Sequence, residues 1–276
     1  MKNIKKITVI VLALALTLAF CTACGGSDSA DAEKTIIVAA TPAPHAEILE
    51  NVVKDILAED GWNLEVVVME DYVKPNQAVT DGDCDANYFQ HINYLNSYNE
   101  ENVTDLVNAG GIHYEPMGIY AGTKKSLDEL ADGDVIGVPN DPTNEARALG
   151  LLAEQGVITL KEGAGVNATV LDIVDKTKNI EVKELEAAML PGQLEELAVA
   201  VINGNYALEA GLKIADALAT ETAESELIAE QYVNIIACAN GNEGSDKIVA
   251  LVKALQSDAV KAYIEENYSG AVQPMF

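Results

Sequence analysis

The sequence predicts an α/β fold made of two lobes. Short apolar runs of strand length alternate with helical segments, and this alternation starts again in the second half of the chain. A glycine-rich, turn-prone segment from Gly110 to Gly122 separates the two groups of runs. The 253 residues from Cys24 onward are enough for two modest domains with separate cores.

The first elements form a strand–helix–strand unit. Thr35 to Ala40 (TIIVAA) has the apolar character of a buried strand, and prolines follow it. Apolar residues from Ile48 to Leu57 recur at helical spacing, and Leu64 to Met69 (LEVVVM) forms the next strand. This order predicts a parallel sheet with a right-handed crossover.

The alternation restarts near residue 134. Asp134 to Pro139 (DVIGVP) predicts a strand, and a helix is expected from Pro142 to Gln155. Further strands are expected at Ala198 to Asn203 and at Tyr232 to Ala239. Helical periodicity then dominates from Ser245 to Asn267.

These two groups of elements define the expected lobes. Because the chain is expected to cross back near Glu230, lobe 1 is discontinuous and comprises residues 34–120 plus 230–276. Lobe 2 comprises residues 121–229. A cleft between two lobes is a natural place for a ligand.

The N-terminus has the features of an export signal. Lysines precede an apolar run from Ile7 to Phe20, which is shorter than the roughly 20 residues of a membrane span. Small residues before Cys24 and a polar stretch after it resemble a bacterial lipobox. The sequence therefore predicts a signal peptide at residues 1–23, lipidation of Cys24 and a flexible tether over residues 24–33. The alternative is an ordinary cleaved secretory peptide.

The chain is strongly acidic. Removal of the signal peptide takes away three of 17 basic residues and none of 44 acidic ones, which leaves a net charge of −30. Such a surface repels phosphate and argues against nucleic acid as a partner. It also argues against electrostatic adhesion to anionic lipid, so we expect membrane contact only through the lipid anchor.

The single arginine, Arg147, lies at the start of the helix expected from Pro142. Asp141 is a good N-cap for this helix, and proline suits its first position. Asn144 and Arg147 are three residues apart and share one helical face near the positive end of the helix dipole. A guanidinium and an amide beside free N–H groups suit a carboxylate. The alternative is a well-capped helix whose arginine pairs with a surface acid.

The segment DANYFQHINYLNSY gathers aromatic side chains around one imidazole. Its rings are Tyr88, Phe89, Tyr94 and Tyr98, its imidazole is His91, and Tyr72 lies upstream of it. Aromatic faces beside an imidazole suit a slender apolar or thioether side chain, because sulfur packs well on ring edges. The alternative is a plain helix core, since the aromatic residues recur at helical spacing.

Two asparagines follow expected strands, at the positions where α/β sheets bind ligands. Asn203 and Asn234 are the candidates, with Asn205 less favoured. Asparagine can serve an ammonium or a carboxylate, because its amide both donates and accepts. The alternative for Asn203 is a simple Asn-Gly turn. His45 opens the first helix, where we expect it to act as a cap, and the alternative is a neighbour of the pocket.

No catalytic or metal-binding pattern occurs in the sequence. It contains no P-loop, no G-x-S-x-G and no H-E-x-x-H, and its histidines and cysteines lack zinc-site spacing. We therefore expect no enzyme activity, no catalytic residue, no cofactor and no metal. Cys84 and Cys238 are weak evidence for a disulfide, and free thiols are at least as well supported.

Taken together, these segments resemble the NLPA lipoprotein family, the methionine-binding lipoproteins of bacterial ABC importers. The resemblance covers nearly the whole mature chain, and many segments in the family's order make it specific. They are TPAPHAEILE, DYVKPNQAV, DANYFQHINYL, HYEPMGIY, PNDPTNEARALGLL, ELEAAMLP, AVINGNYALEAGL and YVNII.

The resemblance implies a two-lobed periplasmic-binding-protein-like fold of type II, with the ligand in the cleft. It implies a lipid-anchored protein of the cell membrane, facing the exterior or periplasm, that delivers L-methionine or a close analogue to a permease driven by a cytoplasmic ATPase. The positions that match the family's methionine side-chain pocket are Tyr72, Phe89, His91 and Tyr94. The position that matches the carboxylate partner is Arg147, and those that match polar contacts are Asn144, Asn203 and Asn234.

Three alternatives stay open at this stage. A receptor for a methionine-containing dipeptide or another apolar amino acid would keep the same head-group residues. An exported hydrolase would require a catalytic constellation, which the sequence does not offer. An adhesin or scaffold lipoprotein would leave the cleft without a ligand.

Overall fold

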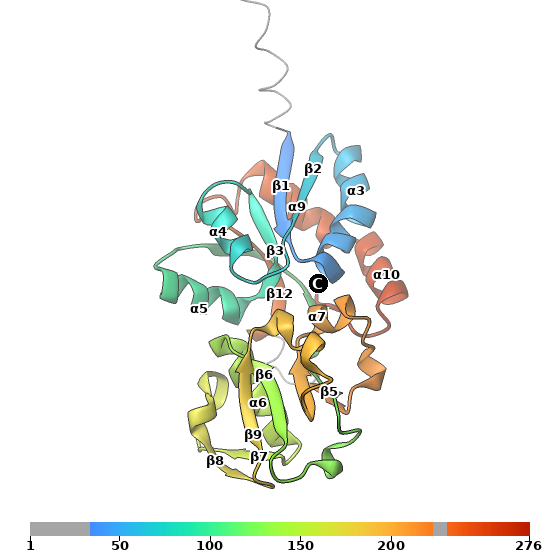
Figure 1. The fold of residues 1–276 in the computed structure, drawn as a ribbon. Helices are drawn as coiled ribbons and strands as arrows, with labels where there is room; N and C mark the ends of the chain where they lie inside the picture. Colours follow the sequence, from blue (N-terminus) through green and yellow to red (C-terminus); the bar gives the residue numbers. More distant parts are fainter. Residues whose placement is uncertain (1–33, 223–230) are drawn as a thin grey trace, which may run out of the picture. The chain divides into compact units, whose positions relative to one another are not determined.

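Two mixed β-sheets organise the fold (Figure 1). The structure, a computed structural model, describes residues 34–222 and 231–276. The predicted signal peptide, the Cys24 lipidation site and the tether therefore lie outside the described residues. Residues Ile36–Phe276 form one compact unit, which contains the whole candidate site.

The first sheet contains six strands. These are β1 (Thr35–Ala40), β2 (Asn63–Val68), β3 (Ala86–His91), β4 (Val107–Tyr114), β12 (Val233–Cys238) and β13 (Gln273–Pro274). Their order is β13-β4-β12-β3-β1-β2, with β1 parallel to β3 and with β12 antiparallel to β3 and β4. The helices of this part of the chain are η1 (Pro42–Ala46), η2 (Leu49–Val53), α3 (Lys54–Glu59), α4 (Lys74–Thr80), α5 (Ile92–Asn102), α9 (Asp246–Leu255) and α10 (Asp258–Asn267).

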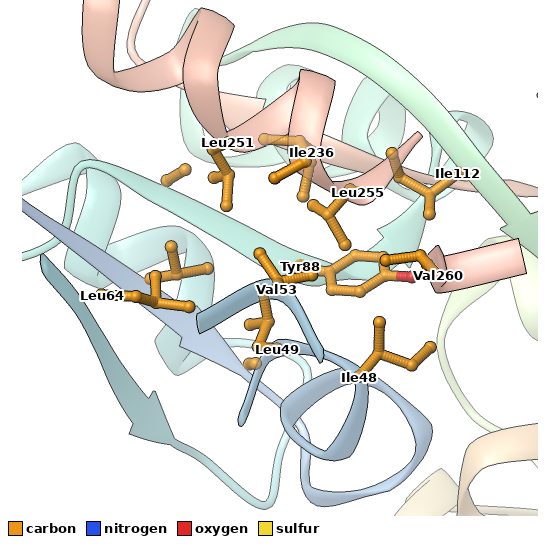
Figure 2. Close-up of a cluster of buried hydrophobic side chains, with 14 of the residues drawn as sticks. Ile48, Leu49, Val53, Leu64, Tyr88, Ile112, Ile236, Leu251, Leu255 and Val260 are labelled. Carbon is orange, nitrogen blue, oxygen red and sulfur yellow. The ribbon is translucent and has the colours of Figure 1, made fainter. Parts of the chain in front are cut away.

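Both faces of the first sheet are covered. Along β1, Val38 and Ala40 belong to one apolar cluster, whereas Ala39 between them belongs to another cluster on the opposite face. Figure 2 shows Tyr88 of β3 in the first cluster, close to Leu255 of α9. Burial on both faces explains why β1 is a continuous apolar run.

The second sheet contains five strands. These are β5 (Gly118–Ala121), β6 (Val135–Pro139), β9 (Glu181–Leu185), β10 (Val199–Ile202) and β11 (Ala219–Thr220), in the order β11-β5-β10-β6-β9. β10 is parallel to β6 and antiparallel to β5. Helix α6 (Pro142–Glu154) packs on β6, and α7 (Gly204–Glu209) follows β10. A small hairpin joins β7 (Ile158–Leu160) and β8 (Ile173–Lys176).

Short 3-10 helices complete the second part of the chain. They are η3 (Leu127–Glu129), η4 (Gly165–Asn167), η5 (Val170–Asp172), η6 (Ala187–Met189), η7 (Pro191–Gln193) and η8 (Ile214–Asp216). The core of this part includes Leu149 and Leu152 of α6 beside Ile136 and Val199. Each sheet therefore has its own apolar core.

The expected strands occur within a residue or two of their predicted ends, and the expected helical segments are helical, with differences in detail. The helix expected from Ile48 to Leu57 consists of the π-helical turn η2 followed by α3. The helical segment from Ser245 to Asn267 is two helices, because Ser257 is extended and its side chain accepts from the amide of Val260, which starts a new helix. The aromatic segment is strand β3 followed by helix α5, rather than one helix.

The expectation that Gly110 to Gly122 is a turn-prone segment was wrong, because this segment contains most of β4 and all of β5. At Gly110, a Cβ atom would lie 2.7 Å from Val252 Cγ1 of α9. Glycine in β4 therefore lets helix α9 approach the sheet closely. Such a close approach cannot be distinguished from a turn in the sequence alone.

Two smaller expectations concern cysteines and membrane spans. Cys84 and Cys238 are both buried as free thiols. Within residues 34–222 and 231–276, no helix has the length and apolar character that a membrane crossing needs.

Two separate glycine substitutions, one buried and one exposed, test the packing of the second sheet. At Gly122 a Cβ atom would press against the carbonyl oxygen of Leu197 and would lie 2.6 Å from that of Leu194. Gly122→Ala should therefore lower the free energy of unfolding by about 1–3 kcal/mol or more, measured by urea denaturation. At the exposed helical Gly150 nothing lies within 4 Å, so Gly150→Ala should raise it by roughly 0.5–1 kcal/mol. Equal effects of the two substitutions would contradict this packing.

Candidate ligand-binding site

A cavity brings together all eight side chains that the sequence nominated for ligand binding. Its lining comprises Tyr72, Phe89, His91, Tyr94, Asn144, Arg147, Asn203 and Asn234. Four further residues, Gln90, Glu115, Gly204 and Asn205, complete the lining. Both sheets contribute to this cavity, which is where the strand-end argument placed a ligand.

The strand ends place residues from the first sheet in the cavity. His91 ends β3 and lies directly opposite Asn234 on the antiparallel strand β12. Its Nδ1 accepts from the amide of Tyr94 at 3.0 Å, so His91 caps helix α5. Its Nε2 lies 3.2 Å from Asn144 Oδ1, at the start of α6. His91 therefore links the first sheet to the helix of the second.

Asn144 connects several of these groups. The Asp141 carboxylate accepts from the Asn144 backbone amide at 3.0 Å, as the predicted N-cap should. The Asn144 side-chain amide also donates to Asp141, at 2.9 Å. Its Oδ1 accepts from Asn203 Nδ2 at 2.9 Å as well as facing His91. Asn144 thus holds the polar wall of the cavity together, and its contact with a ligand stays a prediction.

Arg147 is buried with a carboxylate partner. Its Nε donates to Glu221 Oε1 at 2.8 Å, and its Nη2 donates to Glu221 Oε2 at 2.6 Å. Nη2 also donates to the backbone oxygen of Glu115 at 2.7 Å, and the guanidinium carbon lies 4.6 Å from the ring centroid of Tyr232. Among the described residues, no acceptor takes a hydrogen bond from Nη1. One edge of the guanidinium is therefore fixed by Glu221.

Glu221 is itself held from several directions. Its carboxylate accepts from the Met117 amide at 2.9 Å and from the Tyr114 hydroxyl at 3.1 Å. The acid partner that the sequence allowed for Arg147 is thus present, but it is buried rather than on the surface. Because the pair is desolvated, each charge depends on the other.

A second buried carboxylate, Glu115, lies against two histidines. His113 Nε2 lies 2.7 Å and His45 Nε2 lies 3.3 Å from Glu115 Oε1. The Nδ1 atoms of these rings face the hydroxyls of Tyr88 and Thr41. Neutral rings that donate from Nε2 and accept at Nδ1 satisfy every one of these contacts.

Burial shifts the pKa values of Glu115, His45 and His113 towards their neutral forms. It raises the pKa of the Glu115 carboxyl, and it lowers the pKa of His45 to about 4 and that of His113 to about 3. The two histidines and Glu115 are residue types that bind metals, with ligand atoms within 4.8 Å of one another. Their mutual hydrogen bonds account for the arrangement without a metal.

The expectation that His45 acts only as a helix cap was wrong. Helix η1 has no side-chain cap, and His45 is buried with its Nε2 also 3.1 Å from Asn234 Oδ1. The His45 ring therefore contacts two residues of the cavity lining, Asn234 and Glu115. Gly204 permits the close approach of Glu115, because a Cβ atom there would lie 2.9 Å from Glu115 Oε2.

One polar atom in the cavity wall lacks a partner. Asn203 donates through Nδ2 to Asn144, whereas its buried Oδ1 finds no hydrogen-bond donor among the described residues. A buried acceptor in this condition costs roughly 1–3 kcal/mol. A ligand donor at this position would recover that cost.

The aromatic residues form the other end of the cavity. Tyr72, Phe89 and Tyr94 line it, and Tyr206 lies behind Tyr72 with 4.9 Å between ring centroids. Phe89 and Tyr94 line the cavity, whereas Tyr88 and Tyr98 belong to apolar clusters, and Tyr94 also packs against the cluster that contains Tyr98. Strand alternation separates them, since Tyr88 and Phe89 point to opposite faces of β3.

Two α/β lobes with a cavity that both sheets line define the class of two-lobed substrate-binding proteins, with the periplasmic-binding-protein-like fold of type II. The family model described as NlpA lipoprotein matches residues 36–276. The chain therefore belongs to the NlpA lipoprotein family.

Named relatives and solved structures agree with this family. The chain is 42% identical over 260 residues to the methionine-binding lipoprotein MetQ of Bacillus subtilis (strain 168), covering 92% of this chain and 93% of that protein. A lipoprotein structure from Ruminococcus gnavus is 61% identical with a TM-score of 0.85, covering 87% of this chain and 99% of that one. A nutrient binding protein from Burkholderia cenocepacia, solved bound to methionine, is 42% identical with a TM-score of 0.82, covering 87% and 100%.

The buried imidazole of His91 gives a pH-dependent prediction. Burial, together with the charge of Arg147, lowers the pKa of His91 to about 3, whereas an unfolded histidine titrates near 6.5. Below pH 6.5 the unfolded chain therefore binds a proton that the folded chain does not. His91 alone should lower the free energy of unfolding by about 2 kcal/mol between pH 7 and pH 5.

Urea denaturation of the ligand-free protein at both pH values measures this effect. His91→Gln cannot take up the proton, so its loss of stability over the same interval should be smaller by about 2 kcal/mol. His45 and His113 are present in both proteins and cancel in the comparison. Equal losses in parent and variant would show that His91 is not held neutral in the folded chain.

Proposed function

We propose that this chain is the substrate-binding lipoprotein of an ABC importer, which binds L-methionine between its lobes and delivers it to the membrane permease. The observation that carries this proposal is the composition of one cavity. A buried guanidinium and an unpartnered amide oxygen stand near a buried carboxylate, and three aromatic side chains line the same cavity. These groups complement the two ends of an apolar α-amino acid.

The polar groups suit the head group of the ligand. Arg147 Nη1 is the donor for the ligand carboxylate, since Glu221 holds the Nε edge. Asn203 Oδ1 is an acceptor for the ligand ammonium, and the Glu115 carboxylate beside it supplies opposite charge. Asn144 and Asn234 complete this polar wall.

The aromatic groups suit the side chain. Tyr72, Phe89 and Tyr94 surround a region where a thioether can pack on ring edges. His91 closes this pocket towards Asn144. Relatives named for methionine support the same ligand, and one structural neighbour is titled as bound to methionine.

The envelope context follows from the same family. We propose that Cys24 carries the lipid and that residues 24–33 tether the receptor to the outer face of the cell membrane. A permease with its cytoplasmic ATPase is the partner, and the chain is a receptor without catalytic activity. Relatives named as D-methionine-binding lipoproteins support a transport role rather than an enzymatic one.

Closure of two lobes gives the permease a shape to recognise. We propose lobe boundaries at residues 34–120 plus 230–276 and at 121–229. These bounds place the first sheet in one lobe and β6, β9, β10 and β11 in the other, and β5 (Gly118–Ala121) crosses the boundary. The His91–Asn144 contact then joins the lobes across the cavity. Closure removes water from the pair of Arg147 and the ligand carboxylate, which strengthens their attraction.

Removal of Arg147 tests the head-group assignment. Arg147→Ala should weaken L-methionine binding by about 2–5 kcal/mol, or at least about thirtyfold in Kd, because it truncates one member of a buried charge pair. Isothermal titration calorimetry of parent and variant measures this change. A loss below tenfold would contradict the assignment.

A double variant separates binding from folding. Arg147→Ala leaves Glu221 buried without its partner, whereas Arg147→Ala with Glu221→Ala removes both charges. The double variant should regain part of the lost thermal stability and still fail to bind L-methionine. Lys124→Ala, which removes a half-exposed ion pair with Asp134, is the matched charge control and should bind as the parent does.

A further inference from the structure

Three aromatic rings stand at nearly equal distances from one another. The centroids of Tyr72 and Phe89, and those of Tyr72 and Tyr94, are 5.8 Å apart, and those of Phe89 and Tyr94 are 5.9 Å apart. An atom seated over the centre of this triangle lies within 6 Å of all three centroids, which is the range of a cation–π interaction. We call this group the aromatic triangle (Tyr72, Phe89 and Tyr94).

The tyrosines of the triangle are held in place by their hydroxyls. Tyr72 donates to Asn205 Oδ1 at 2.5 Å, and Tyr94 donates to the backbone oxygen of Tyr72 at 3.0 Å. The ring of Tyr206 backs Tyr72, and its own hydroxyl donates to the backbone oxygen of Glu70. The rings are therefore preorganised, and their hydroxyl protons are already used by the protein.

The surroundings of the triangle are acidic. Burial raises the pKa of the Tyr72 hydroxyl well above its usual value, and the charges of Glu115, Asp141 and Glu209 raise it further. Burial and nearby acids, among them Asp141, also raise the pKa of the Tyr94 hydroxyl. The rings with which Arg147 makes its cation–π contacts are Tyr114 and Tyr232, which lie outside the triangle. A positive charge at the triangle is thus attracted by the ring electrons, and by these acids in their ionised form.

We propose that this pocket also accepts α-amino acids whose side chain ends in a methylated sulfonium, represented by S-methyl-L-methionine. The inference rests on the proposed amino-acid site, because the head group binds through the same residues. A sulfonium differs from the thioether of methionine by one methyl group and one positive charge. The aromatic triangle brings three rings within cation–π range of one position, as in the aromatic cages that bind methylated ammonium groups.

A neutral isostere isolates the contribution of the charge. In L-homoleucine a CH group replaces the sulfonium sulfur of S-methyl-L-methionine, so the two ligands have nearly the same shape. Calorimetry of the parent protein should give a Kd for S-methyl-L-methionine at least tenfold below that for L-homoleucine. Equal or tighter binding of L-homoleucine would overturn the inference.

Variants that lack one ring test whether the aromatic triangle causes the preference for S-methyl-L-methionine over L-homoleucine. Phe89→Leu keeps apolar volume but removes one ring face, so the ratio of the two Kd values should fall to about threefold or less. Tyr94→Leu is a second variant with the same expectation. Tyr263→Leu removes a ring on α10 outside the cavity and should leave the ratio unchanged. An unchanged ratio in both triangle variants would overturn the inference.

L-methionine, titrated in parallel, keeps the two proposals distinguishable. Tight L-methionine binding beside weak S-methyl-L-methionine binding would sink the sulfonium inference alone. Failure of the folded parent to bind L-methionine would instead overturn the proposed function. Thermal unfolding of each variant shows whether it is folded before its Kd values are compared.

Discussion

The buried guanidinium of Arg147 is the constraint on which the site depends. A charge removed from water must be compensated locally, and Arg147 achieves this through Glu221, the backbone oxygen of Glu115 and the ring of Tyr232. Glu221 in turn requires the amide of Met117 and the hydroxyl of Tyr114, which lie where the chain passes from β4 to β5. The charge pair therefore ties helix α6 to the crossing between the two sheets.

This arrangement changes how a carboxylate ligand can be bound. The planar fork of arginine usually meets a carboxylate with two parallel hydrogen bonds. Here the edge formed by Nε and Nη2 already makes that contact with Glu221, so the protein uses the fork to fix the guanidinium. The guanidinium is thereby held in one orientation. Preorganisation of this kind lowers the entropy lost when a ligand binds.

The two ends of the cavity have different physical characters. The head-group end contains Arg147, Glu115 and Asn203, where buried polar atoms are costly unless a ligand satisfies them. The side-chain end contains the aromatic triangle, whose attraction depends on ring faces and shape. In the proposed function, recognition of the amino-acid head group is thus separated from the choice among side chains.

Much of the fold could be predicted from sequence, because local patterns carried it. Apolar runs located β1 and β6, and Asp141 with Pro142 located the start of α6. Arg147 could be nominated because it is the single arginine in an otherwise lysine-based chain. The eight nominated side chains share one cavity, although their contacts with a ligand stay predictions.

The remainder depended on contacts that no local pattern reveals. Glu221 is 74 residues from Arg147 and is one of 44 acidic residues, so nothing in the sequence distinguishes it. Glu115 and His45 meet only because β4 and η1 come together in the fold. Gly110 looked like a turn residue, whereas it permits close packing of α9. HYEP, one of the segments that carry the family resemblance, contains Glu115 and was the one available signal for it.

A crystal structure of the chain with L-methionine tests the central claim most directly. We predict that the ligand carboxylate lies within hydrogen-bond distance of Arg147 Nη1 while Glu221 keeps its contacts with Nε and Nη2. We also predict that the ligand ammonium lies at Asn203 Oδ1. A structure in which the ligand carboxylate displaces Glu221, or in which the amino acid binds in the reverse direction, would contradict this claim.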